Sequence, residues 1–214
     1  MVKGHLSVYI GPVSSGKTTQ LCHELNQYSS CGFKVLYINS KLDTRADGAM
    51  STHNQGISLS MSIKTVKVLE CNKRALSESG INFLDYDIIG IDEASFFPDL
   101  TEIKEWVDTN DKIVIVVGLD GSYIRGDFGK VTDLIKHSDK CIKFTGKCVD
   151  CLRDGKRTVT DAPFSAKISG STAILDVGGD DKYICVCRTH WLRRNCVLTE
   201  DETFDRTIID LSKI

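Results

Sequence analysis

The sequence predicts an α/β fold with a mainly parallel sheet, followed by a second, smaller unit. Short apolar runs alternate with helical patterns along the first two-thirds of the chain, as in domains built from alternating strands and helices. These runs are almost continuously apolar, which is typical of strands covered on both faces. After about Cys141 the pattern gives way to a stretch rich in Gly, Lys, Asp, Ser and Thr. We therefore expect one α/β core that occupies most of the chain.

The strands and helices of this core can be assigned from the spacing of apolar residues. The expected strands are Leu6–Ile10, Lys34–Ile38, Val66–Leu69, Asp87–Ile91 and Lys112–Val117. The first helix lies between the first two strands, because Leu21, Leu25 and Tyr28 recur at helical spacing and Gly32 supplies a stop. Two further helices are expected around Leu100, Ile103 and Trp106–Val107, and around Val131 and Leu134–Ile135.

Length and charge limit the classes of partner. The chain has 214 residues, of which 41% are hydrophobic and 26% charged, as in ordinary globular proteins. The formal net charge is -2, and no run of Lys and Arg reaches five residues. We therefore expect neither nucleic acid nor a membrane surface as a partner. No apolar run reaches about 18 residues and no signal segment precedes the first strand, which predicts a cytoplasmic protein.

The motif Gly11–Thr18 predicts a phosphate-binding loop. It fits the pattern G-x4-G-K-[ST] and lies between an expected strand and an expected helix, as that chemistry requires. Backbone N–H groups of the loop would hold the phosphates of ATP, Lys17 would reach the β and γ oxygens, and the Thr18 hydroxyl would ligate Mg²⁺. The phosphate-binding candidates are Gly11, Pro12, Val13, Ser14, Ser15, Gly16, Lys17 and Thr18.

Two carboxylates follow the fourth expected strand. Asp92 comes at the end of this apolar run. Enzymes with a phosphate-binding loop have a second Mg²⁺-binding residue at this place, so Asp92 is the expected partner of the metal. Glu93 then lies at the carboxyl end of the sheet, where ligands of open α/β sheets bind, and is free to act as a base.

Two short pairs of cysteine and histidine predict a structural Zn²⁺ site. Cys148 and Cys151 form one pair, and Cys187 and His190 form the other, so that four ligands would leave no open position on the metal. Cys185 is a rival for Cys187, because two residues apart on a strand they share a face. Cys187 is preferred since it gives a two-residue spacing to His190. The five isolated cysteines are expected to fill the core: Cys22, Cys31, Cys71, Cys141 and Cys196.

Five segments together resemble the type II thymidine kinases, a family with cytosolic human and poxviral members. In chain order they are Gly11–Thr18, Leu42–Arg45, Gly90–Pro98, Gly118–Tyr123 and Gly178–Tyr183. The resemblance covers about residues 4 to 195. It implies a RecA-like core over residues 1–144, a zinc-anchored lasso domain over 145–195 and a tail over 196–214. It also implies ATP-dependent phosphorylation of the 5'-hydroxyl of thymidine, and of deoxyuridine too, by a homotetramer.

The same resemblance assigns roles to further residues. Glu93 matches the family's general base, and Arg45 and Asp43 match residues at the phosphates. Tyr123 falls where the family usually has Phe beside the base, and Ser165 where it has a lasso Thr. The remaining nucleoside-binding candidates are the lasso residues Ile174, Leu175, Asp176, Val177 and Gly178, together with Tyr183, which matches a Tyr that packs on the nucleoside.

Two other classes of protein compete with this interpretation. In an ATP hydrolase or motor, Glu93 of the Asp92–Glu93 pair would activate water, but the chain offers no basic surface for a polymer track. A non-enzymatic zinc module would explain the segment from Cys148 to His190 and leave the phosphate-binding loop without a role. A GTPase is disfavoured because no [NT]-K-x-D motif follows a strand.

Overall fold

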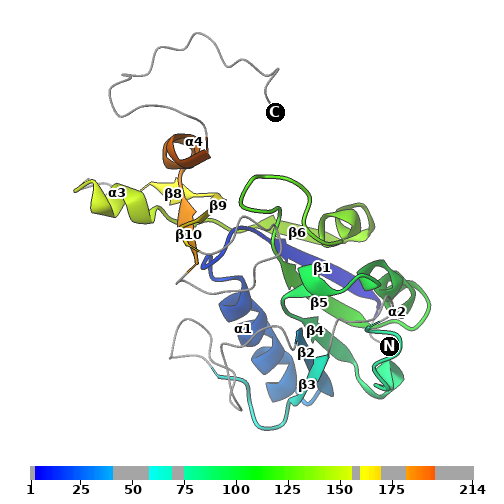
Figure 1. Cartoon of the computed structure of the whole chain (residues 1–214). Helices are drawn as coiled ribbons and strands as arrows, with labels where there is room; N and C mark the ends of the chain where they lie inside the picture. Colours follow the sequence, from blue (N-terminus) through cyan, green and yellow to red (C-terminus); the bar gives the residue numbers. More distant parts are fainter. Residues whose placement is uncertain (1–2, 41–57, 69–74, 156–159, 170–181, 196–214) are drawn as a thin grey trace.

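A computed structural model of the chain describes residues 3–40, 58–68, 75–155, 160–169 and 182–195 (Figure 1). The strands of the larger part are β1 (His5–Ile10), β2 (Val35–Ser40), β3 (Lys64–Val68), β4 (Ile88–Ile91), β5 (Ile113–Gly118) and β6 (Lys140–Lys143). They form one six-stranded sheet in the order β3-β2-β4-β5-β1-β6. All the strand pairs in this sheet are parallel, which confirms the predicted fold class.

The apolar strands are covered on both faces, because successive side chains point to opposite sides of a sheet. Leu6, Val8 and Ile10 of β1 belong to one buried cluster, whereas Tyr9 between them belongs to the other. Helix α1 (Lys17–Ser30) packs on the Tyr9 side through Leu21 and Leu25. Its approach to the sheet is close. A Cβ placed on Gly90 of β4 would lie 2.6 Å from Leu25 Cδ1, so a side chain at this position would displace the helix.

The other face is covered by short helical segments. These are the 3₁₀ helices η3 (Leu100–Ile103) and η4 (Thr132–His137) and the α-helix α2 (Lys104–Asp108), with η1 (Phe83–Asp85) and η2 (Ala94–Phe96) nearby in the chain. The two later helices predicted from the sequence are therefore present, but one begins as 3₁₀ and the other is wholly 3₁₀. Apolar spacing alone does not distinguish such short segments from α-helix.

The smaller part lies beyond β6 and has its own buried cluster (Figure 1). It contains two short antiparallel pairs, β7 (Gly146–Lys147) with β8 (Asp161–Ala162), and β9 (Phe164–Lys167) with β10 (Tyr183–Val186). Two helices complete it, α3 (Val149–Arg153) and α4 (Arg188–Asn195). In Figure 1 these elements gather above the carboxyl end of the sheet, on the side where β1 runs into α1.

The isolated cysteines follow the expectation only in part. Cys22 is fully buried in α1, as predicted. Cys31 and Cys141 are exposed, so the prediction that they fill the core is wrong. Cys31 follows the last turn of α1, and Cys141 lies on β6, whose four residues are all exposed. Cys71 and Cys196 lie outside the described residues.

Candidate active site

The loop between β1 and α1 has the backbone conformation that phosphate-binding loops require. Gly11 has a φ of 150°, and a Cβ at this position would lie 2.5 Å from the Phe144 carbonyl oxygen. Ser14 has a φ of 53°, which is uncommon for a residue other than glycine. Helix α1 begins at Lys17, so its first N–H groups and the positive end of its dipole face the loop.

Lys17 is buried within this loop. Its ammonium group donates to the Pro12 carbonyl oxygen at 2.6 Å and to Ser15 Oγ at 3.2 Å. Burial of a lysine requires such partners, because an unpaired ammonium loses its hydration without compensation. The positive charge is thus fixed beside the backbone that would hold a triphosphate.

Asp92 follows β4 and lies next to the start of α1. Its Oδ1 accepts from Thr18 Oγ1 at 3.2 Å and from the Glu93 backbone N–H at 2.9 Å, and its Oδ2 accepts from the Tyr37 hydroxyl at 3.0 Å. Burial, and then the negative charge of Glu93, raise the pKa of Asp92 to about 6. A cation beside Asp92 would favour its ionised form. The Thr18 and Asp92 oxygens are spaced like neighbouring ligands of Mg²⁺, which prefers oxygen atoms about 2.1 Å from the ion.

Glu93 is half-buried and occupies a strained position. Its φ of 49° and ψ of 36° are left-handed, and it lies at the turn from β4 into η2. For a residue other than glycine this conformation costs on the order of 1 to 3 kcal/mol and is found most often at functional sites. The turn places a carboxylate at the carboxyl end of the sheet, one residue from Asp92.

Two predicted nucleoside-binding residues of the smaller part face the core. Ser165 on β9 accepts a hydrogen bond from the Val13 backbone N–H of the phosphate-binding loop at 3.1 Å, although the two residues are 152 positions apart. Tyr183 on β10 lies beside Tyr123 of the loop after β5, with ring centroids 6.4 Å apart. The structure thus brings Tyr123, Ser165 and Tyr183 to the side where the smaller part meets the core.

Several predicted site residues lie outside the described residues. They are Asp43 and Arg45 at the phosphates, and the lasso residues Ile174, Leu175, Asp176, Val177 and Gly178.

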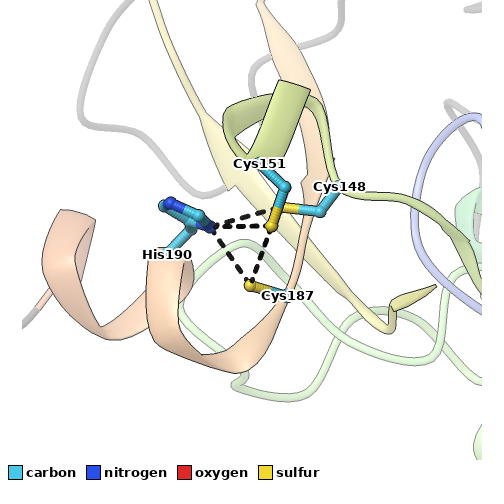
Figure 2. Close-up of side chains that lie close together, drawn as sticks. All are labelled: Cys148, Cys151, Cys187 and His190. Carbon is cyan, nitrogen blue, oxygen red and sulfur yellow. Dashed lines mark hydrogen bonds between the residues drawn. The ribbon is translucent and has the colours of Figure 1, made fainter. Parts of the chain in front are cut away.

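The two cysteine-containing pairs converge on one point (Figure 2). Cys148 and Cys151 come from the start of α3, while Cys187 and His190 come from the start of α4. His190 Nδ1 lies 3.4, 3.6 and 3.1 Å from the sulfur atoms of Cys148, Cys151 and Cys187, respectively. All four ligand atoms lie within 4.8 Å of one another. Ligands about 2.0 to 2.3 Å from a tetrahedral zinc would be roughly 3.5 to 3.8 Å apart, so the cluster fits such an ion.

The surroundings of the cluster orient its ligands. Nε2 of His190 lies 2.8 Å from Asp154 Oδ2, which leaves Nδ1 to face the sulfur atoms. Burial acts to raise the pKa of the Cys187 thiol, but hydrogen bonds from the backbone and ring of His190 lower it to about 6. A low thiol pKa favours the thiolate that binds metal. Cys185 is buried elsewhere, with its thiol donating to the Lys147 carbonyl oxygen at 3.2 Å.

Residues 4–191 match the family model described as thymidine kinase. The chain belongs to the thymidine kinase family. Curated members of that family align with nearly their whole length. The thymidine kinase of raccoon poxvirus is 33% identical over 186 residues, which cover 86% of this chain and 95% of the relative. That of Yaba monkey tumor virus is 33% identical over 192 residues, covering 90% and 97%.

A third relative, the thymidine kinase of vaccinia virus strain Western Reserve, is 34% identical over 185 residues, which cover 86% of this chain and 95% of the relative. The thymidine kinase family thus accounts for the core and for most of the smaller part together. Neither the hydrolase nor the isolated zinc module gains support from these matches. Within the described ranges, no helix has both the length and the apolar character to cross a membrane.

Sequence reasoning missed several residues of the site in this thymidine kinase family member. Tyr37 bonds Asp92 from the neighbouring strand β2, and Asp154 holds His190. Trp191 and Arg125 contact each other across 66 positions of the chain. In the sequence, Tyr37 looks like an ordinary aromatic residue of the core and Asp154 like an ordinary acidic residue of a loop. Neither belongs to a motif that would indicate a functional role. Trp191 directly follows His190, a predicted zinc ligand, and this was the only hint in the sequence.

Proposed function

We propose that this protein transfers the γ-phosphate of ATP to the 5'-hydroxyl of thymidine, and also of deoxyuridine. The observation that carries the proposal is the meeting of Thr18 and Asp92, which joins the phosphate-binding loop to the Asp92–Glu93 turn at one end of the sheet. This arrangement lies within the segment that matches the thymidine kinase family. The named relatives, thymidine kinases of poxviruses, support thymidine as the acceptor.

In the proposed mechanism, the chain's residues position the reactants and neutralise charge. Lys17 and the N–H groups at the start of α1 bind the phosphates, with Asp43 and Arg45 assigned to the same task by the family pattern. Thr18 and Asp92 would hold Mg²⁺, which when bound neutralises charge on the β and γ oxygens. Glu93 accepts the proton of the 5'-hydroxyl, and its strained turn fixes the direction of its carboxylate.

The nucleoside would lie between the core and the smaller part. Tyr123 and Tyr183 offer two aromatic rings for a planar base, and Ser165 holds β9 against the phosphate-binding loop. The family pattern adds backbone contacts from residues 174–178 to the edge of the base. We also propose the domain division 1–144, 145–195 and 196–214, and a cytoplasmic homotetramer, on the family pattern alone.

One assay tests the proposed activity. Purified protein with ATP and Mg²⁺ is expected to form a nucleoside monophosphate from thymidine and deoxyuridine, but not from deoxyadenosine or deoxyguanosine. ATP hydrolysis without nucleoside is expected to be slow, because water must be excluded when the acceptor is a hydroxyl. Rapid hydrolysis without any acceptor, together with no nucleotide product, would support the hydrolase alternative instead.

We propose that the Cys148, Cys151, Cys187 and His190 cluster holds a structural Zn²⁺, and expect about one zinc per chain. Replacement of Cys187 by Ser is expected to lose most of the zinc, because a hydroxyl is a far weaker ligand than a thiolate. Cys185→Ser is the matched control, two residues away and equally conservative, and should keep its zinc since Cys185 bonds Lys147. Elemental analysis of both variants gives the answer. Zinc lost from Cys185→Ser and kept by Cys187→Ser would reverse the assignment.

Loss of the zinc is expected to affect the nucleoside more than ATP. Cys151→Ser should raise the KM for thymidine by about tenfold while the KM for ATP stays within a few-fold, because the cluster anchors the smaller part and the phosphate-binding loop belongs to the core. Steady-state kinetics with each substrate varied in turn measure both values. Equal increases in the two KM values would contradict a separate anchoring role.

A further inference from the structure

Helix α4 contacts the loop after β5 as well as contributing to the metal cluster. Trp191 directly follows His190 and is 8% exposed. Its indole Nε1 donates to the Tyr123 carbonyl oxygen at 2.8 Å. A buried indole N–H needs an acceptor, and here the acceptor belongs to the backbone of a proposed nucleoside-binding residue. The helix that brings His190 to the cluster therefore also fixes the position of Tyr123.

Arg125 makes a second contact between the same two elements. Its guanidinium carbon lies 3.4 Å from the centroid of the Trp191 ring and 4.4 Å from that of Phe164 on β9. The rings of Phe164 and Trp191 are tilted by 55° with centroids 6.3 Å apart. The guanidinium therefore contacts both rings of this pair, which we call the aromatic wedge. A planar cation over an indole is the most favourable form of this interaction.

The turn that carries these contacts has an unfavourable backbone. Arg125 has a φ of 61°, in the left-handed region that a residue with a Cβ seldom adopts. Its N–H donates to the Ser122 carbonyl oxygen, and the Ser122 N–H donates to the Gly126 carbonyl oxygen, both at 2.9 Å. Strained conformations persist where the surroundings hold them. Here the surroundings include α4 and β9, which contact the turn on both sides of Ile124.

We propose that Arg125 and Trp191 are positioning residues for the nucleoside site, which couple the place of α4 to that of Tyr123. Neither residue is assigned to the reacting groups; they act through the Tyr123 backbone. The inference rests on the proposed role of Tyr123 beside the base. It predicts that weakening the contact lowers nucleoside affinity without removing the metal and without changing the phosphate-transfer step.

Three variants test this link by kinetics. Arg125→Ala and Trp191→Phe are each expected to raise the KM for thymidine by about three- to tenfold, the range set by one cation–π contact or one hydrogen bond. The kcat, the KM for ATP and the zinc content should stay within twofold of the unmodified protein. Arg125→Lys keeps the charge but loses the planar stack, and should recover part of the affinity. This pattern separates positioning from a loss of folding, which would lower the apparent kcat and the zinc content but leave both KM values of the remaining folded protein unchanged.

Arg188→Ala is the matched control. Arg188 begins α4, is exposed, and lies 4.9 Å from the centroid of the same Phe164 ring. Its removal deletes an arginine–aromatic contact of the same kind without touching the Tyr123 turn, so the thymidine KM should not change. A KM increase with Arg188→Ala equal to that with Arg125→Ala would overturn the proposal, because the effect would then be general to the aromatic wedge.

Fluorescence provides a readout that does not depend on turnover. The chain has two tryptophans, and Trp106 stacks on Phe83 in the other part of the molecule. In a Trp106→Phe background, emission from Trp191 is expected to change when thymidine is added without ATP. The added Arg125→Ala change should shift that titration to higher thymidine concentration by the same factor as the KM.

The outcomes distinguish this inference from the proposed function. If the unmodified protein does not phosphorylate thymidine, the proposed function fails and the inference with it. If the unmodified protein is active but Arg125→Ala and Trp191→Phe leave the thymidine KM within twofold, the inference alone is overturned. Loss of zinc from Arg125→Ala in parallel with the KM increase would also overturn it, because the turn would then support the metal cluster.

Discussion

Glu93→Gln is expected to lower the kcat of thymidine phosphorylation by about 10²-fold or more. A positioned base contributes typically 10² to 10⁴ in rate, and an amide of the same size cannot accept the proton. Glu93 lies in a left-handed turn directly after β4, beside the buried Asp92. Glutamine keeps the shape of the side chain, so binding of ATP and thymidine should remain within a few-fold. Steady-state kinetics test the expected loss of kcat, and a separate binding measurement for each substrate tests whether ATP and thymidine still bind.

Glu105→Gln is a suitable control for this variant. Glu105 is an exposed glutamate on α2, away from the carboxyl end of the sheet, and its replacement should leave kcat unchanged. Hydrolysis of ATP without nucleoside should be measured for the unmodified protein, Glu93→Gln and Glu105→Gln. If Glu93→Gln kept kcat within a few-fold while both substrates still bound, Glu93 would not be the base. If it mainly abolished a rapid hydrolysis without acceptor, the carboxylate would be activating water.

The central strands β1, β2, β4 and β5 were predictable because they are buried on both faces. Runs such as Lys112–Val117 are recognisable from composition alone, and β5 occupies nearly the same residues. The sixth strand, β6, was missed for the opposite reason. It lies at the edge of the sheet, pairs with β1, and all four of its residues are exposed. Its sequence, with Cys141 and Ile142 between two lysines, therefore lacks the continuous apolar run of a buried strand. Edge strands are defined by the neighbour that they pair with, which a single sequence does not contain.

The residues of the candidate site likewise fall into those that the sequence predicts and those that it does not. Gly11–Thr18, Asp92 and Glu93 are contiguous with strands, and the spacing within each motif reflects local geometry that one segment can encode. The contacts of Asp154 with His190 and of Trp191 with Tyr123 join segments far apart in the chain. The first contact depends on how α3 and α4 pack together within the smaller part, and the second on how that part packs against the core. No local pattern records either packing.

The exposed cysteines show the limit of reasoning from residue type. A free cysteine is among the most often buried residues, so the core was the reasonable expectation for Cys31 and Cys141. Both lie where the backbone leaves the core, one after the last turn of α1 and the other on an edge strand. Their exposure is set by the position of those elements.

Lys17→Ala is expected to reduce kcat/KM for ATP by about 10²-fold or more. The ammonium group is held at 2.6 Å from the Pro12 carbonyl oxygen, at the start of α1, and a charged donor in a buried site contributes far more than one in water. Thymidine binding should change little, because the proposed nucleoside residues Tyr123 and Tyr183 lie elsewhere. Initial rates with ATP varied at fixed thymidine measure the loss.

Lys34→Ala is the matched control for charge, since Lys34 is exposed at the end of the chain segment that leads into β2. Lys17→Met retains the length of the side chain and separates loss of charge from collapse of the loop. Both Lys17 variants should melt within a few degrees of the unmodified protein. Turnover close to normal at saturating ATP in either Lys17 variant would exclude this lysine from the transfer step. The loop would then serve only to pack α1 against β1, which requires glycines but no buried ammonium group.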